Sequence, residues 1–396
     1  MRWFIPSLLG LAGLVPAVPA PIALPGVTPI VKGKAFDRFI TIFLENQDYA
    51  KVAIDSHMAE LKRHGILLTR CYAETHPSQP NYLAAIAGDY FGNNHDDWVR
   101  IPENVATIVD LLEDKNISWA GYFEDIPSPG YMGNYSDGST GTDGWDYVRK
   151  HNPFVSFDSI TNHGERLLQI DSFDTFQRAF AARQVPQFAF LTPNMMNDGH
   201  NTTLEFATEW SHKFLEPLLA DRAFDEPTLI ALTYDESEDY AQPNHIVTLL
   251  LGSAVPPALR GTTDDTFYTH YSFLSTLEAN WGLHNLGRYD VGANVFKFVA
   301  EKVGYAGNRD PDNAKSVNNS VSYPGALHNT TDKVLPYPPP NTRLIGASGL
   351  PVLPAIVKAW EGQPGQGQKT WQTPYDGSGR VVDGDLNLPV YKSPLE

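Results

Sequence analysis

The stretch RFITIFLENQD (residues 38–48) joins an apolar run to a group of polar side chains. Its first seven residues are rich in β-branched and aromatic side chains, which favours a buried strand over residues 38–44. Glu45 and Asn46 follow at once, and the ligands of open α/β sheets bind beyond the carboxyl ends of strands. A carboxylate and an amide oxygen at such an end can hold a hard cation. The alternative for this pair is a helix N-cap with an acidic first turn.

Similar apolar runs alternate with amphipathic segments between residues 36 and 300. This alternation predicts βαβ units on a largely parallel sheet, and therefore one large α/β domain. Beyond the first, we expect strands over residues 66–71, 117–123, 187–191, 228–233 and 245–251. Helices are expected over residues 52–63, 80–87, 105–112, 173–182, 204–219 and 270–281. A length of 396 residues allows this domain and a smaller appendage.

Three other regions differ from this alternation. Residues 1–20 contain Arg2, an apolar run and small terminal residues, which is the layout of a secretory signal peptide. Residues 127–162 are rich in Gly, Ser, Asp and Asn and predict a long surface loop that shapes a substrate entrance or only covers the surface. Residues 305–396 are rich in Pro and Gly, which predicts a C-terminal extension. This extension ends without an apolar tail, so we expect no stable membrane anchor.

Glycosylation signals, cysteine usage and charge limit the cellular context. The Asn-X-Ser/Thr sequons have their asparagines at Asn116, Asn134, Asn201, Asn318 and Asn329. Together with the signal peptide they predict a protein secreted to the medium or the cell wall. The single cysteine, Cys71, excludes an intramolecular disulfide and is expected to be a small buried residue rather than a reactive thiol. The net charge of −17 disfavours nucleic acid and anionic membranes as partners.

The second predicted strand leads into ETHPSQPNYLAAIAG (residues 74–88). Pro80 suits the first turn of a helix, which places Ser78 at the helix N-terminus. Free N–H groups and the helix dipole favour an anionic oxygen and a bound phosphate there. The alternative for Ser78 is a plain N-cap.

Two further strand ends carry polar groups. Asp235 and Glu236 follow the strand 228–233, and both carboxylates can reach one ion only if the strand breaks into a loop there. A solvated acidic loop is the alternative. His200 follows the strand 187–191 and His245 begins the last strand, and either could contact phosphate or donate a proton. The alternative for each is a hydrogen-bonded structural histidine.

The ordered motif set is more specific than any one of its members. It comprises Glu45-Asn46, Ser78-Gln79-Pro80-Asn81, Asn197-Asp198-Gly199-His200, Asp235-Glu236 and Asn244-His245. Over residues 36–300 this set resembles the phosphoesterase family that contains fungal secreted acid phosphatases, bacterial acid phosphatases and phosphatidylcholine-type phospholipases C. That family is a branch of the alkaline phosphatase superfamily. The resemblance implies a three-layer αβα domain like that of alkaline phosphatase.

The resemblance also implies roles for residues. One divalent metal ion would be bound by Glu45, Asn46, Ser78, Asp235 and Glu236, with Ser78 also the nucleophile. Phosphate binding or proton transfer would fall to Asn81, Asp198, His200 and His245, with His200 and His245 as candidate general acids. An oxygen-rich shell without cysteine is compatible with calcium, magnesium, manganese or zinc.

The implied function is a secreted acid phosphatase that hydrolyses small phosphate monoesters through a phosphoserine intermediate. Plant phospholipases of the family carry Arg where this chain has Tyr82, and their last motif is more closely spaced than residues 235–245 here. These departures favour the phosphatase over the alternative, a phospholipase C-type phosphodiesterase. A hypothesis of another class is a non-catalytic secreted protein that binds a cation or a glycan, with Ser78 as a helix cap.

Overall fold

The computed structural model of the chain describes residues 29–362, except residues 139–143, 226, 312–313, 315–318, 320–321 and 330–334. The predicted signal peptide, Asn318 and the end of the C-terminal extension lie outside the described residues. Within them, no helix is long and apolar enough to cross a bilayer.

The described residues form a central sheet with the strand order β4-β3-β5-β1-β6-β7-β2-β8, and β9 also pairs with β2. The strands are β1 (Arg38–Leu44), β2 (Ile66–Tyr72), β3 (Trp119–Phe123), β4 (Ile170–Asp171), β5 (Phe188–Thr192), β6 (Thr228–Tyr234), β7 (His245–Leu251), β8 (Thr262–Asp264) and β9 (Tyr268–Thr269). All neighbours are parallel except β7, which runs antiparallel to both β6 and β2. The prediction of a largely parallel α/β sheet is confirmed.

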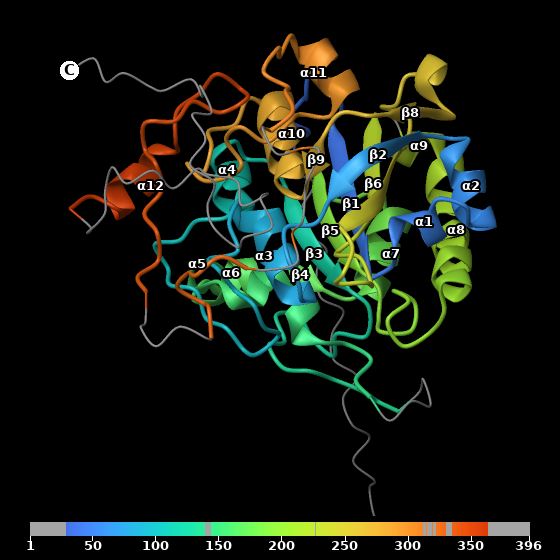
Figure 1. Ribbon diagram of the computed structural model, residues 1–396, viewed down its shortest axis with the longest axis horizontal. Coiled ribbons are helices and arrows are strands. Elements are labelled where there is room, and N and C mark those ends of the chain that lie inside the picture. Colours follow the sequence, from blue (N-terminus) through green and yellow to red (C-terminus); the bar gives the residue numbers. More distant parts are fainter. Residues whose placement is uncertain are drawn as a thin grey trace, which may run out of the picture.

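Helices cover both sides of this sheet (Figure 1), with α3 and α10 on one side and α2 and α8 on the other. The α-helices are α1 (Tyr49–Val52), α2 (Ser56–Lys62), α3 (Ser78–Ala87), α4 (Ile108–Asp114), α5 (Asp158–Thr161), α6 (Gly164–Leu167), α7 (Phe173–Ala181), α8 (Leu204–Ala220), α9 (Arg222–Asp225), α10 (Tyr271–Trp281), α11 (Lys297–Val303) and α12 (Pro354–Ala359). The 3₁₀-helices are η1 (Arg149–His151), η2 (Pro153–Ser156) and η3 (Pro257–Leu259). The three-layer αβα architecture predicted for the domain is therefore present.

The central strand β1 explains why the core lies where it does. All but the first of its residues are buried, because a strand covered on both faces by helices is apolar at every position rather than at alternate ones. Its neighbours β5 and β6 are buried along their whole length. The polar residues that follow these strands are therefore attached to a rigid core that excludes water.

The prediction of a long surface loop over residues 127–162 is wrong for its second half. Residues 149–161 contain η1, η2 and α5, and Phe154, Val155 and Phe157 are buried. The Phe154 ring packs against Trp119 and Phe123 of β3. The composition of the whole region hid this short apolar run, which packs against β3 and β5.

The described part of the C-terminal extension packs onto the domain. Val352 forms a β-bridge with Asn285, and Trp360 is buried with its indole N–H donating to the Asn104 carbonyl at 2.7 Å. Apolar side chains in a Pro-rich segment thus fix it to the surface of the domain. Asn116, Asn134, Asn201 and Asn329 are exposed.

Candidate active site

Ser78 lies between two acidic side chains that come from different strands. It is the first residue of α3, and its Oγ is 3.2 Å from Glu45 Oε2 and 3.2 Å from Glu236 Oε1. Glu45 follows β1 and Glu236 follows β6, and these parallel strands are in register up to Leu44 and Tyr234. The carboxyl ends of the two strands therefore present both carboxylates to the same hydroxyl.

Asp235 contributes a third buried carboxylate. β6 ends at Tyr234, so the chain has already left the strand at Asp235 and Glu236. Asp235 Oδ1 accepts the Glu236 N–H at 2.7 Å, whereas its Oδ2 is buried without a hydrogen-bond partner in the described part of the chain. Burial, and then the charge of Glu45, raise the pKa values of both Asp235 and Glu236. The strand therefore breaks before these two carboxylates, which is the condition for both of them to reach one ion.

Glu45 lies at the centre of the acidic groups. Its Oε1 accepts the Tyr82 hydroxyl at 2.8 Å and lies 2.9 Å from His151 Nε2. Burial alone would raise the pKa of Glu45, but His151, Lys150 and His200 outweigh burial and hold it below its usual range. Glu45 is therefore the carboxylate of the site that stays ionised most readily.

A second group of potential ligands shares Glu45. Potential ligand atoms of Glu45, His151 and Asp198 lie within 4.8 Å of one another, close enough to hold a metal ion. Asp198 Oδ1 accepts the His200 N–H at 2.8 Å, while its Oδ2 is buried without a hydrogen-bond partner among the described residues. Burial, followed by the charge of Glu45, raises the pKa of Asp198. The carboxylates are thus disposed for a cation on either side of Glu45.

Lys150 brings a cation to the serine. Its Nζ lies 3.5 Å from Ser78 Oγ and 3.0 Å from Asp96 Oδ2. Burial lowers the pKa of Lys150, but Glu45 and Asp96 outweigh burial and raise it above its usual value. The ammonium group therefore stays protonated beside the hydroxyl, as a group that binds phosphate oxygens must.

Sequence reasoning missed Lys150 and His151. Both lie in η1, within the region expected to be a loop. The only available signal was the basic triplet Arg149-Lys150-His151 in a chain of net charge −17. Arg149 anchors this turn, since its guanidinium donates to the carbonyls of Val99 and Val155 at 2.9 and 2.8 Å.

Other sequence-predicted residues have different surroundings. Asn46 is half-buried next to Glu45. Asn81 is engaged in the loop before α3, where its Oδ1 accepts the Glu74 N–H at 2.9 Å and its Nδ2 donates to the Thr75 carbonyl at 2.8 Å. Asn244 donates to the same carbonyl at 2.9 Å. These two amides shape the loop that leads to Ser78.

The two candidate histidines differ in their surroundings. His200 is exposed, and its ring centroid lies 6.5 Å from that of His151. His245 is stacked between Tyr49 and Tyr72 at 3.9 and 4.8 Å. Its Nε2 lies 2.9 Å from the Thr69 carbonyl oxygen. The structure thus brings His200 to the edge of the acidic group and engages His245 in packing against β2.

A model of the "Phosphoesterase family" matches residues 33–284. An acid phosphatase of Aspergillus fumigatus is 49% identical over 298 residues, which is 75% of this chain and 66% of that protein. A probable acid phosphatase of Kluyveromyces lactis is 46% identical over 332 residues, 84% of this chain and 77% of that protein. A phosphatidylinositol-3-phosphatase of Mycobacterium tuberculosis is 30% identical over 64% of this chain and 79% of its own length.

Solved structures give more distant matches. A protein in the alkaline phosphatase superfamily from Vibrio parahaemolyticus aligns with a TM-score of 0.40 and 14% identity, over 64% of this chain and 70% of that chain.

Proposed function

Because the chain belongs to the phosphoesterase family, as its motifs predicted, we propose that it is a secreted acid phosphatase that cleaves phosphate monoesters with Ser78 as its nucleophile. The observation that carries this proposal is the Ser78 hydroxyl, 3.2 Å from each of two buried carboxylates and 3.5 Å from the Lys150 ammonium. Relatives named acid phosphatase or probable acid phosphatase, 43–49% identical, support the reaction class.

A divalent cation fits the donor set. Asp235 has a buried carboxylate oxygen without a hydrogen-bond partner among the described residues, and burial and the charges of Glu45 and Glu236 raise its pKa. Buried charges of one sign require a counter-charge. Glu45, Asn46, Ser78, Asp235 and Glu236 would hold the ion. When bound, such an ion supplies Lewis acidity and lowers the pKa of a coordinated hydroxyl.

The chain's own residues then divide the remaining work. Ser78 Oγ attacks phosphorus in line and forms a phosphoserine, which water hydrolyses. Lys150 binds the equatorial phosphate oxygens and offsets their charge as the leaving oxygen departs. Asp96 positions the lysine at 3.0 Å. His151 holds the Glu45 carboxylate from the other side through its Nε2, and the Asp198 carbonyl accepts the Glu45 N–H at 3.0 Å.

His200 is the proposed general acid for the leaving alcohol. It is exposed at the edge of the site, where a leaving group would exit, and its backbone N–H donates to Asp198 at 2.8 Å. His245, with its ring between two tyrosines, is less accessible for this role.

Ser78→Ala tests the central claim. Hydrolysis of p-nitrophenyl phosphate at acidic pH should fall by at least about 10³-fold, because the nucleophile is lost. Wild-type enzyme quenched in acid during turnover of ³²P-labelled substrate should carry a labelled phosphoserine at position 78. Substantial hydrolysis by the variant would mean that water attacks directly.

Substrate class is tested with the same preparations. Activity toward bis-p-nitrophenyl phosphate or phosphatidylcholine above that toward p-nitrophenyl phosphate would favour the phosphodiesterase. If the wild-type protein hydrolysed none of these three substrates, the hypothesis of a non-catalytic protein that binds a cation or a glycan would be favoured.

Export is part of the proposal. It is supported by the signal-peptide layout of residues 1–20 and by the exposure of Asn116, Asn134, Asn201 and Asn329. Protein recovered from culture medium should lose mass on treatment with an endoglycosidase, and an unchanged mass would contradict glycosylated export.

A further inference from the structure

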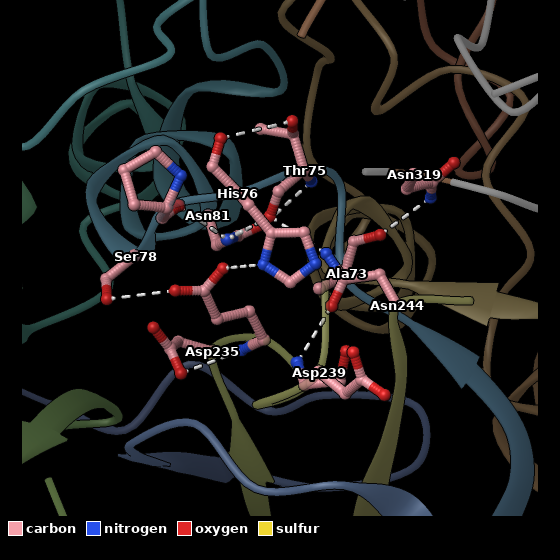
Figure 2. A network of polar contacts seen from close by, with 12 residues as sticks. Ala73, Thr75, His76, Ser78, Asn81, Asp235, Asp239, Asn244 and Asn319 are labelled. Atoms are coloured by element: carbon pink, nitrogen blue, oxygen red, sulfur yellow. Dashed lines mark hydrogen bonds and ion pairs between the residues drawn. The ribbon is translucent and has the colours of Figure 1, made fainter. Parts of the chain in front are cut away.

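Part of the C-terminal extension lies against the loop that leads to Ser78. We call residues 319 and 322–327 the strap, and residues 73–77, between β2 and α3, the nucleophile loop. The strap lies beyond residue 284, where the match to the family model ends. Figure 2 shows Asn319 beside Ala73, in the same polar network as Ser78.

Two buried strap residues make polar contacts with the nucleophile loop. Asn319 Nδ2 donates to the Ala73 carbonyl at 2.7 Å. Ser322 Oγ lies 2.9 Å from Thr75 Oγ1 and donates to the Asn93 carbonyl at 2.7 Å. Since the single Ser322 proton points to Asn93, the Thr75 hydroxyl is the donor in the first pair. The strap therefore accepts a hydrogen bond from a side chain three residues before the nucleophile.

Thr75 is also held from the domain side. Its carbonyl accepts amide protons from Asn81 at 2.8 Å and from Asn244 at 2.9 Å, and its N–H donates to Asn81 Oδ1 at 3.2 Å. Thr75 is fully buried. Its side-chain hydroxyl faces the strap, so the strap completes the set of contacts around this residue.

The strap is fixed at the other end of α3 as well. The Tyr323 hydroxyl bonds to Asp89, which follows the helix, and the Leu327 N–H donates to the Phe91 carbonyl at 3.0 Å. A Cβ on Gly325 would lie 2.3 Å from the Phe91 carbonyl oxygen, so the two backbones are in direct contact. The strap thus holds both the loop before α3 and the turn after it.

We infer that Asn319 and Ser322 are positioning residues for catalysis, which hold the nucleophile loop so that Ser78 points at the phosphate. This inference rests on the proposed role of Ser78. A nucleophile must be kept within about 0.5 Å of its productive position, and a misplacement of about 1 Å can cost on the order of 10²-fold in rate. A strap that only covered the core would affect stability and leave the turnover of the folded enzyme unchanged.

The test uses the full chain and compares Ser322→Ala, Thr75→Val and the double variant. Each single variant should lower kcat for p-nitrophenyl phosphate by about 10-fold. KM should change by less than about twofold, because Lys150 and the acidic groups are untouched. The double variant should be no slower than the slower single one, since both remove the same contact. Thr75→Ser, which keeps the hydroxyl, should retain kcat.

Ser348→Ala is the matched control. Ser348 also lies in the C-terminal extension and donates to a backbone carbonyl, that of Leu283, at 2.5 Å, but it contacts no part of the nucleophile loop in the described structure. Removal of the Ser348 hydroxyl should leave kcat within about twofold of the wild-type value. Thermal unfolding of every variant checks that each one is folded. Unchanged kcat in Ser322→Ala, or an equal loss in Ser348→Ala, overturns the inference. High activity of Ser78→Ala would instead refute the serine nucleophile itself, so the two failures are distinguishable.

Discussion

Two buried acidic groups lie at the opposite ends of α3, and they are built differently. At the C-terminal end, Asp290 accepts the backbone N–H groups of Leu286 and Arg288 at 2.6 and 2.7 Å, and Asp89 accepts that of Phe91 at 2.8 Å. At the Ser78 end, Asp235 keeps a carboxylate oxygen without a hydrogen-bond partner among the described residues. Asp89 and Asp290 thus stabilise a turn through hydrogen bonds from backbone N–H groups, whereas Asp235 has a carboxylate oxygen available to a ligand.

The largest effect that separates the two groups should come from Asp235→Asn. We expect kcat to fall on the order of 10³-fold, because a cation ligand is lost. Stability should hold or increase, since one of several like charges is removed. Kinetic and thermal-unfolding measurements on the same preparation check the expected loss of kcat and the expected stability. Retention of more than a tenth of the activity would place Asp235 with the structural acids.

The same variant sharpens the position of the ion, with Asp198→Asn as its counterpart. Elemental analysis after dialysis should find the divalent ion reduced in Asp235→Asn and retained in Asp198→Asn. The opposite pattern would place the ion among Glu45, His151 and Asp198 instead.

Lys150→Met should have the next largest effect. Loss of the ammonium near Ser78 should lower kcat/KM about 10²-fold, as removal of one charge-stabilising donor does in other enzymes. Lys150→Arg, which keeps the charge, should recover part of the activity. Lys51→Met is the control, because Lys51 pairs with Glu238 at the exposed surface, where ion pairs contribute little. Equal activity of Lys150→Met and the control would remove Lys150 from the site.

The sequence predicted the acidic part of this site because geometry constrains it. Glu45 directly follows β1, and Asp235 and Glu236 are the first two residues after its parallel neighbour β6; the carboxyl ends of such strands meet at one edge of a sheet. Ser78 was predictable from the proline two residues later, although α3 begins at Ser78 itself and not at residue 80.

Other parts of the site could not be predicted from the residues that follow each strand. Lys150 is brought to Ser78 by η1, a single turn whose position depends on long-range contacts of Arg149. The ring of His245 packs between tyrosines from two different elements, which spacing along the chain does not reveal. The strap contacts join residues far apart in the chain, such as Asn319 and Ala73 at |i−j| = 246. Tertiary packing, not local pattern, places these groups.

The smallest predicted effect belongs to the structural acids. Burial raises the pKa of Asp290, against the opposing hydrogen bonds from Glu278 and the backbone. A carboxyl whose pKa is raised by folding contributes stability below its unfolded pKa of about 3.9 and loses that contribution as pH rises through the folded value. The titration of Asp290 should therefore contribute a fall in the melting temperature of the wild type as pH rises above about 4.

Asp290→Asn removes this titration and should make the fall smaller by about 2 °C. The difference between the two curves reports on Asp290 together with Glu278, which is coupled to it, because the acids around Ser78 titrate in both proteins. At acidic pH kcat should stay within about twofold, since Asp290 lies beyond the far end of α3 and its contacts are with the turn at residues 286–288. Parallel melting curves would show that Asp290 does not titrate over this range. A large loss of kcat would mean that the two acidic groups are coupled through α3, and the distinction between a structural and a functional group would fail.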